Sequence, residues 1–108
     1  MATAQEKMQQ AADKIEANKD RVKEIGAVYK FSLSGDGGGT WIMDLRDNPG
    51  IREGDGDAQC TLKLSAKDYV DMMEGKAKAQ QLFFESRLKI EGDIGLAMKL
   101  QKLMELIG

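Results

Sequence analysis

The 108-residue sequence contains no histidine and only one cysteine. Imidazole is the usual general base and a common metal ligand, so its absence excludes Ser-His-Asp and Cys-His nucleophiles, His-ligated zinc and facial-triad iron sites. Cys60 cannot form an intramolecular disulfide, which suits a reducing compartment. Four acids lie near one another in the sequence, namely Asp44, Asp47, Asp55 and Asp57. No feature of the sequence places them at a substrate pocket, where they could act as general acid and base. We therefore expect a protein that is not an enzyme.

The charges are nearly balanced, with 16 Lys and Arg against 18 Asp and Glu and a formal net charge of −2. A nucleic-acid-binding surface needs clustered Lys and Arg, so we expect no nucleic-acid partner. No apolar run approaches the roughly 20 residues that cross a bilayer. The first residues also lack the apolar core of a signal peptide. These features predict one soluble domain over residues 1–108.

Hydrophobic periodicity predicts an α+β domain with five strands and about four helices. Helical periodicity covers 5–25, a short segment that Ser65 caps and Gly75 ends, the segment 77–85, and 93–107. Alternation with a period of two indicates strands at 29–34, 41–45, 51–53, 60–64 and 87–91. We expect a mostly antiparallel sheet with helices covering one face.

Two loops invite ligand-site interpretations. The glycine-rich run 35–39 lacks the Gly-Lys-Ser/Thr ending of a phosphate loop and joins two strands, so we interpret it as a hairpin tip. Asp55 and Asp57, with Asp47 nearby, could bind calcium, but their spacing does not continue into an EF-hand loop. We expect neither a metal nor a cofactor.

The C-terminal quarter is the apolar end of the chain, because half of residues 82–107 are Leu, Ile, Phe or Met. On a helical wheel the apolar stripe of the last helix covers about half the circumference, wider than docking on one sheet face requires. Met98 lies off that stripe. Seven methionines are also a high count. They suit either an irregular core or a surface that repacks around apolar guests, and composition favours the core.

The order of motifs resembles the type-2 sterol carrier proteins, a family of small lipid-transfer domains, over nearly the whole chain. The run 83–101, FFESRLKIEGDIGLAMKLQ, is similar to the family's segment almost letter for letter. Ser86-Arg87 stands where the family has Gly-Lys, which keeps the positive charge and removes a glycine. Further matches follow in the same order: Tyr29-Lys30-Phe31, Thr40-Trp41 with Asp44, the run 56–61, and the run 72–76.

The resemblance implies an apolar tunnel that carries fatty acids, fatty acyl-CoA, phospholipids or sterols, without catalytic residues, metal or cofactor. Gln101 is the candidate for a polar contact to the head group. The expected lining residues are Phe83, Phe84, Leu88, Ile90, Leu96, Leu100, Leu103 and Met104, with Trp41, Met72 and Met73 as further candidates.

We expect a monomer that contacts membranes transiently to collect its lipid. The mixed-charge first helix is a weak candidate for that contact, since packing on the sheet is its expected role. The alternative is a protein-interaction module that docks lipid-metabolising enzymes through an apolar face. The sequence ends in Leu106-Ile107-Gly108 rather than a peroxisomal tripeptide, which predicts a cytoplasmic location.

Overall fold

The computed structural model describes residues 2–107, except for the side chain of Gln101. Within this range the helices are α1 (Ala4–Ala17), α2 (Lys19–Val22), α3 (Ala66–Met73), α4 (Ala79–Phe84), α5 (Ile94–Met98) and α6 (Leu100–Ile107). The strands are β1 (Val28–Ser34), β2 (Gly39–Asp44), β3 (Gly50–Glu53), β4 (Cys60–Ser65) and β5 (Lys89–Gly92). No helix in the described range is long and apolar enough to cross a membrane.

The strands form one open sheet in the order β3-β2-β1-β4-β5. Strands β1 and β4 at its centre are parallel, and the other three pairs are antiparallel. Strands β2 and β3 follow β1 as a meander on one side, which leaves the other edge of β1 to β4, and β4 runs parallel to β1. The five-stranded, mostly antiparallel sheet and the hairpin tip at 35–39 are thereby confirmed.

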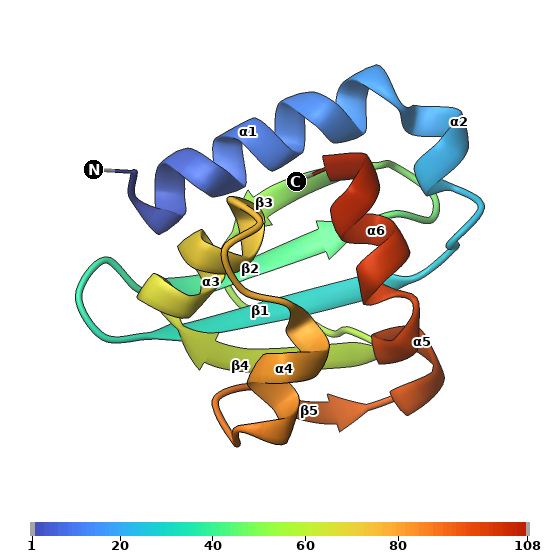
Figure 1. Ribbon diagram of the computed structural model, residues 1–108. Coiled ribbons are helices and arrows are strands. Elements are labelled where there is room, and N and C mark those ends of the chain that lie inside the picture. Colours follow the sequence, from blue (N-terminus) through green and yellow to red (C-terminus); the bar gives the residue numbers. More distant parts are fainter. Residues whose placement is uncertain (1, 108) are drawn as a thin grey trace.

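The helices lie on one face of the sheet (Figure 1). Phe31 on β1 is in register with Trp41 on β2 and Leu62 on β4, so these three buried side chains point to the helix face. The opposite face carries charged side chains that pair across strands or loops. Lys30 contacts Asp55 at 2.7 Å, and Lys63 on β4 contacts Glu91 on β5 at 2.8 Å.

The predicted helix 5–25 is interrupted at Asn18. The side-chain amide of Asn18 donates a hydrogen bond of 2.8 Å to the carbonyl oxygen of Lys14, and its backbone leaves the helical region with φ −127° and ψ 34°. Asn competes with helical geometry in this way because its short side chain reaches nearby backbone groups. The helical pattern was right about burial, since α1 turns Met8, Ala11 and Ile15 into the core.

The predicted helix 93–107 is also two helices, α5 and α6, which meet at Lys99. The carbonyl oxygen of Leu96 accepts hydrogen bonds from the Lys99 N–H at 3.1 Å and from the Tyr29 hydroxyl at 2.7 Å. The break divides the wide apolar stripe between the two helices. All residues of the stripe are buried or packed against the core: Leu96, Ala97, Leu100, Leu103, Met104, Leu106 and Ile107. Met98, off the stripe, is exposed.

Candidate functional site

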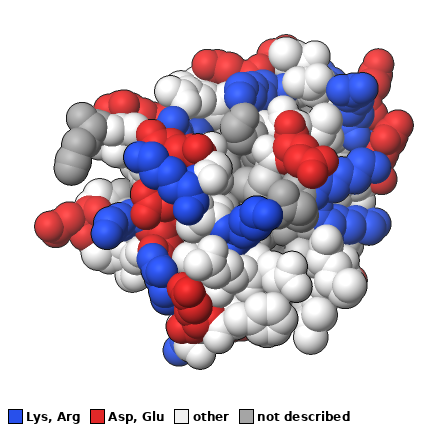
Figure 2. Space-filling view, viewed as in Figure 1, with Lys and Arg blue, Asp and Glu red and all other residues white. Residues whose placement is uncertain are grey.

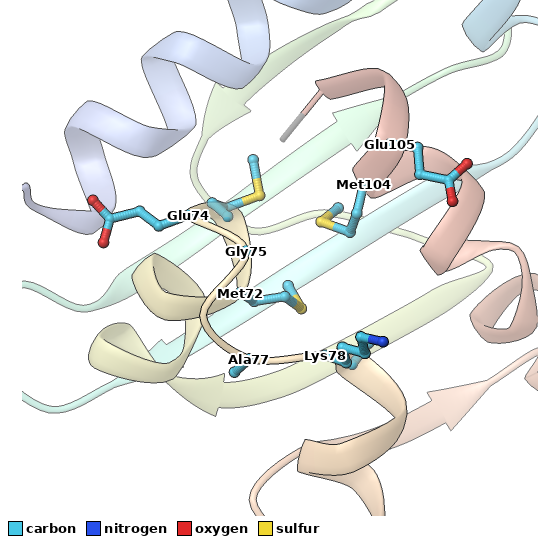
Figure 3. A pocket seen from close by; sticks show the side chains of 9 residues that line it. Met72, Glu74, Gly75, Ala77, Lys78, Met104 and Glu105 are labelled. Carbon is cyan, nitrogen blue, oxygen red and sulfur yellow. The ribbon is translucent and has the colours of Figure 1, made fainter.

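A pocket of about 340 Å³ opens to the surface between the end of α3, the link from α3 to α4, and α6 (Figure 3). Its volume lies at the small end of the range for ligand pockets. Three methionines, three small residues and three charged residues line it: Met72, Met73, Met104, Gly75, Ala77, Ala79, Glu74, Lys78 and Glu105. The pocket is therefore a methionine-lined opening with a charged rim.

Helix α3 places two of these methionines. The Ser65 hydroxyl caps its start by accepting a hydrogen bond of 3.0 Å from the Asp68 N–H, which confirms Ser65 as the cap. The helix ends before Gly75, whose φ of 78° suits the residue that lacks a Cβ. Met72 and Met73 occupy the last turn, and both are buried beside the pocket.

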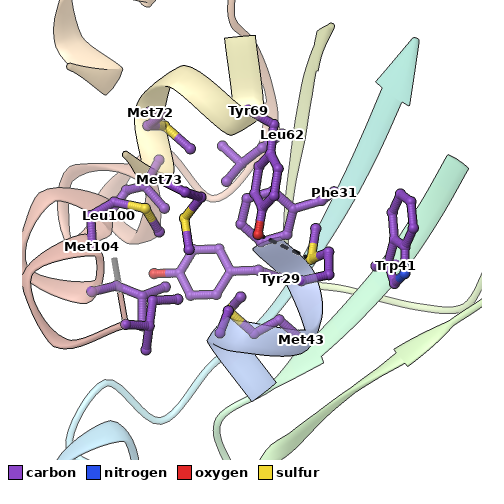
Figure 4. Close-up of a cluster of buried hydrophobic side chains, with 14 of the residues drawn as sticks. Tyr29, Phe31, Trp41, Met43, Leu62, Tyr69, Met72, Met73, Leu100 and Met104 are labelled. Atoms are coloured by element: carbon purple, nitrogen blue, oxygen red, sulfur yellow. Dashed lines mark hydrogen bonds between the residues drawn. The ribbon is translucent and has the colours of Figure 1, made fainter. Parts of the chain in front are cut away.

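The three methionines adjoin an aromatic part of the core (Figure 4). Phe31 and Tyr69 meet edge to face with ring centroids 5.5 Å apart. The Tyr69 hydroxyl donates to the Met8 sulfur at 3.1 Å. Burial raises the pKa of Tyr69 and of Tyr29 above the ordinary tyrosine range, and Cys60 and Asp93 add smaller contributions at Tyr29. Both phenols are therefore neutral at physiological pH, and the interior behind the pocket carries no tyrosinate charge.

The charges at the rim are unevenly paired. Glu74 contacts Lys76 at 3.2 Å and Lys7 at 3.5 Å, and the hydrogen bond from Lys76 is the main reason why its pKa is lowered. Lys78 has no acidic partner within the described part of the chain. The rim thus carries one cation, Lys78, and one acid, Glu105, without a charged partner among the described residues.

An ion pair between a buried carboxylate and an exposed arginine fixes the turn that leads into β5. Asp68 is buried on α3, and its carboxylate accepts hydrogen bonds from Nε of Arg87 at 3.3 Å and from Nη2 of Arg87. Arg87 also contacts Glu85 at 2.9 Å. Between them Ser86 has a φ of 60°, the left-handed region that favours glycine. The fold therefore accommodates Ser86-Arg87, with strain at Ser86 and a paired Arg87.

The structure distributes the predicted lining residues over three environments. Met72, Met73 and Met104 line the pocket. Ile90 and Leu96 are half-buried against the core, whereas Leu88, Leu100, Leu103 and Trp41 are buried within it. Trp41 lies on β2, at a distance from the three pocket methionines (Figure 4). Phe83 and Phe84 are exposed. The side chain of Gln101 lies outside the described residues. Whether any of these touches a lipid stays a prediction, as does the enclosed tunnel.

Sequence reasoning missed the link between α3 and α4. Gly75, Ala77, Lys78 and Ala79 line the pocket there. The signal was present as a run of small residues and lysines, GKAKA, between two short helices with apolar inner faces. Within residues 2–107 no group of His, Cys, Asp and Glu side chains could hold a metal ion.

Two curated relatives are similar to most of this chain. Hydroxysteroid dehydrogenase-like protein 2 from Bos taurus is 44% identical over 88 residues, which cover 79% of this chain and 21% of that protein. Sterol carrier protein 2 from Rattus norvegicus is 38% identical over 93 residues, 82% of this chain and 17% of that protein. The chain thus spans about a fifth of the length of these relatives.

Solved structures share the fold. Sterol carrier protein 2 from Yarrowia lipolytica in its apo form has a TM-score of 0.80 and 25% identity, covering 93% of this chain and 88% of that one. Sterol carrier protein 2 from Aedes aegypti, solved with the C16 fatty acid palmitate, has a TM-score of 0.80, 21% identity and full coverage of both chains. The SCP-2 sterol transfer family matches residues 6–105, and the chain belongs to that family.

Proposed function

We propose that this chain binds and carries a lipid with a long apolar tail and does not act on it chemically. Membership of the SCP-2 sterol transfer family supports the proposal, as does the palmitate in the Aedes aegypti protein. The observation that carries it is the position of Met72, Met73 and Met104 between a surface opening and the apolar core. The dehydrogenase in the name of the Bos taurus relative belongs to a protein about five times longer than the matched region.

The methionines provide a route for the tail. Methionine is unbranched and flexible, so the three side chains can turn aside and be replaced by the methylenes of an entering tail. Each methylene buried contributes about 0.8 kcal/mol, and ordering the chain and the ligand offsets a large part of the total. The expected result is reversible binding that suits transfer.

The rim suits a polar head group. Lys78 is the one cation among the nine lining residues, and it would favour a carboxylate or phosphate at the mouth. Glu74, already paired with Lys76 and Lys7, opposes this attraction only weakly. Glu105 on α6 has no charged partner among the described residues, and it opposes the attraction more strongly the closer the head group lies to α6. We propose that the apolar tail enters and the head group stays at the surface.

The direct test of lipid binding at this site fills the pocket with a larger side chain. Ala77 lies on the rim, and in Ala77→Trp an indole would occupy space that the tail needs. We expect fluorescent fatty acid to bind at least about tenfold more weakly than to the unaltered chain, because several methylenes would lose their site. Ala17→Trp, at an exposed position at the end of α1, is the matched control. Equal binding by the unaltered chain and Ala77→Trp would contradict this site, and no binding by the unaltered chain would contradict the function.

A further inference from the structure

The pocket methionines have a chemical property that lipid carriage does not use. A methionine thioether is oxidised to a sulfoxide, a reversible modification that converts a flexible apolar side chain into a polar one. Three of the seven methionines of this chain, Met72, Met73 and Met104, line one surface opening. Figure 3 shows Met72 and Met104 extending into the hollow from opposite sides, from α3 and α6. An oxidant that enters the pocket therefore meets several thioether side chains.

The opening gives a small oxidant access to these side chains. Met72, Met73 and Met104 are only 5%, 6% and 9% exposed, but the pocket of about 340 Å³ beside them opens to the surface. Hydrogen peroxide is little larger than water, and it is uncharged. Figure 2 shows charges of both signs in the middle of this face, where the pocket opens, and neither sign repels a neutral molecule. Access therefore depends on whether the pocket is empty or filled.

The other methionines of the described residues have different surroundings. Met98 on α5 is 80% exposed and lies outside the pocket. Met43 on β2 is fully buried, and the sulfur of buried Met8 accepts the hydrogen bond of 3.1 Å from the Tyr69 hydroxyl. We expect Met98 to be oxidised first, the pocket methionines next, and Met8 and Met43 last. Only the middle group links oxidation to the pocket.

We propose that Met72, Met73 and Met104 form a peroxide-sensitive modification site whose oxidation reversibly turns lipid binding off. In the reaction the O–O bond of hydrogen peroxide breaks, one oxygen bonds to the thioether sulfur, and the other leaves as water with both protons. The sulfur is oxidised by two electrons, and the peroxide is reduced. A methionine sulfoxide reductase reverses the modification: the sulfoxide oxygen leaves as water, and two thiols are oxidised to a disulfide.

The sulfoxide changes what the pocket accepts. Its oxygen is a hydrogen-bond acceptor, and a lipid tail offers no donor, so an entering tail would bury that oxygen without a partner. Each buried sulfoxide should therefore weaken binding of a tail about tenfold. A tail that is already bound fills the space through which peroxide arrives. Oxidation is thus directed at the empty chain, and a loaded chain keeps its lipid. These effects on binding rest on the proposed function, whereas oxidation of the site does not.

The experiment treats the full chain with increasing amounts of hydrogen peroxide and makes two measurements on each sample. Peptide mass spectrometry gives the fraction of sulfoxide at each methionine, and titration with fluorescent fatty acid gives the affinity. We expect the affinity to fall about tenfold as the pocket methionines are oxidised, and not during the earlier oxidation of Met98. Methionine sulfoxide reductase with a thiol reductant should restore it. Circular dichroism should show a folded chain throughout, and loss of the folded spectrum together with the affinity would contradict a local effect.

Variants separate the pocket from the rest of the chain. Met98→Leu removes the exposed methionine outside the pocket, and it should lose affinity in peroxide as the unaltered chain does. In Met72→Leu combined with Met73→Leu and Met104→Leu, the affinity before treatment is the reference, and peroxide should lower it far less. Met104→Gln, whose amide oxygen resembles the sulfoxide oxygen, should bind fatty acid more weakly than Met104→Leu without any peroxide. Equal binding by Met104→Gln and Met104→Leu would contradict the effect of polarity in the pocket.

Three further results would overturn the modification site. The first is full affinity in a chain whose pocket methionines are oxidised. The second is oxidation of these methionines only after the chain unfolds, because the opening would then not admit the oxidant. The third is equal oxidation with and without excess palmitate, since a bound tail should shield the sulfurs. Failure of the untreated chain to bind fatty acid would contradict the proposed function instead, and the order of oxidation would still test access to the site.

Discussion

The hydroxyl group of Tyr29 donates a hydrogen bond to the carbonyl oxygen of Leu96, with 2.7 Å between the two oxygens. Tyr29 lies on the central strand β1, and Leu96 lies in α5, next to the break at Lys99. The bond ties the C-terminal helix pair to the sheet. Since α6 carries Met104, the bond also holds one wall of the pocket in place.

Tyr29→Phe removes this bond and leaves the ring. We expect a loss of about 1 kcal/mol in the free energy of unfolding, the usual net value of a hydrogen bond, together with faster amide hydrogen exchange in α6. Urea unfolding and exchange measure the two effects. Tyr69→Phe is the control, because the Tyr69 hydroxyl has only the weaker acceptor sulfur of Met8. An unchanged urea midpoint for Tyr29→Phe would mean that the bond does not anchor the helices.

Stability should fall at alkaline pH. Burial raises the pKa of Tyr29 and Tyr69 above the ordinary value of 10.0, so the folded state keeps phenolic protons that the unfolded state releases. Above about pH 10 the unfolded chain binds fewer protons than the folded chain, and the free energy of unfolding decreases as pH rises. Below that pH the contribution is fully present. Urea titrations on both sides of pH 10 measure this, and a flat profile through the alkaline range would refute it.

Ser86→Gly should stabilise the fold. Ser86 has a φ of 60°, which costs a residue with a Cβ about 1–2 kcal/mol, while glycine loses about 0.5–1 kcal/mol more chain entropy on folding. We expect a net gain of roughly 0.5–1 kcal/mol in urea unfolding. Ser86→Ala keeps the Cβ and should show no gain. If both variants were stabilised equally, relief of backbone strain would not be the reason.

Arg87→Ala should destabilise the chain more than Glu85→Ala does. The first change leaves the buried carboxylate of Asp68 without its partner, whereas the second removes only an exposed contact to Arg87. Asp68→Asn combined with Arg87→Ala should recover part of the loss, because no buried charge remains. Thermal unfolding of the three variants gives the order, and equal destabilisation by Arg87→Ala and Glu85→Ala would contradict the role of the pair.

The strands were predictable because alternation is local. Tyr29, Phe31 and Leu33 alternate with polar residues, and the structure buries that side of β1. The parallel pairing of β1 with β4 was not predictable in this way, since it depends on which strand edge stays free after β2 and β3 have paired. The helix breaks at Asn18 and Lys99 also escaped periodicity, because each involves hydrogen bonds that a helical wheel does not contain.

Part of the candidate site was named through the family resemblance. Met72, Met73 and Met104 were among the lining residues that it implies, and they line the pocket, whereas composition alone favoured a core role for the methionines. The link with Ala77 and Lys78 was missed, because small and charged residues in a loop carry no periodic signal. Phe83 and Phe84 were expected to face a lipid and are exposed, so their contact with the tail stays a prediction. The cytoplasmic location and the monomeric state also stay predictions.

The central claim is that a lipid tail replaces the methionines at the pocket. Native mass spectrometry of the protein purified from cells, followed by organic extraction, tests it most directly. The account predicts a monomer with one acyl lipid or sterol bound, lost in Ala77→Trp and kept in Ala17→Trp. An empty protein that also takes up no fluorescent fatty acid would contradict the carrier function.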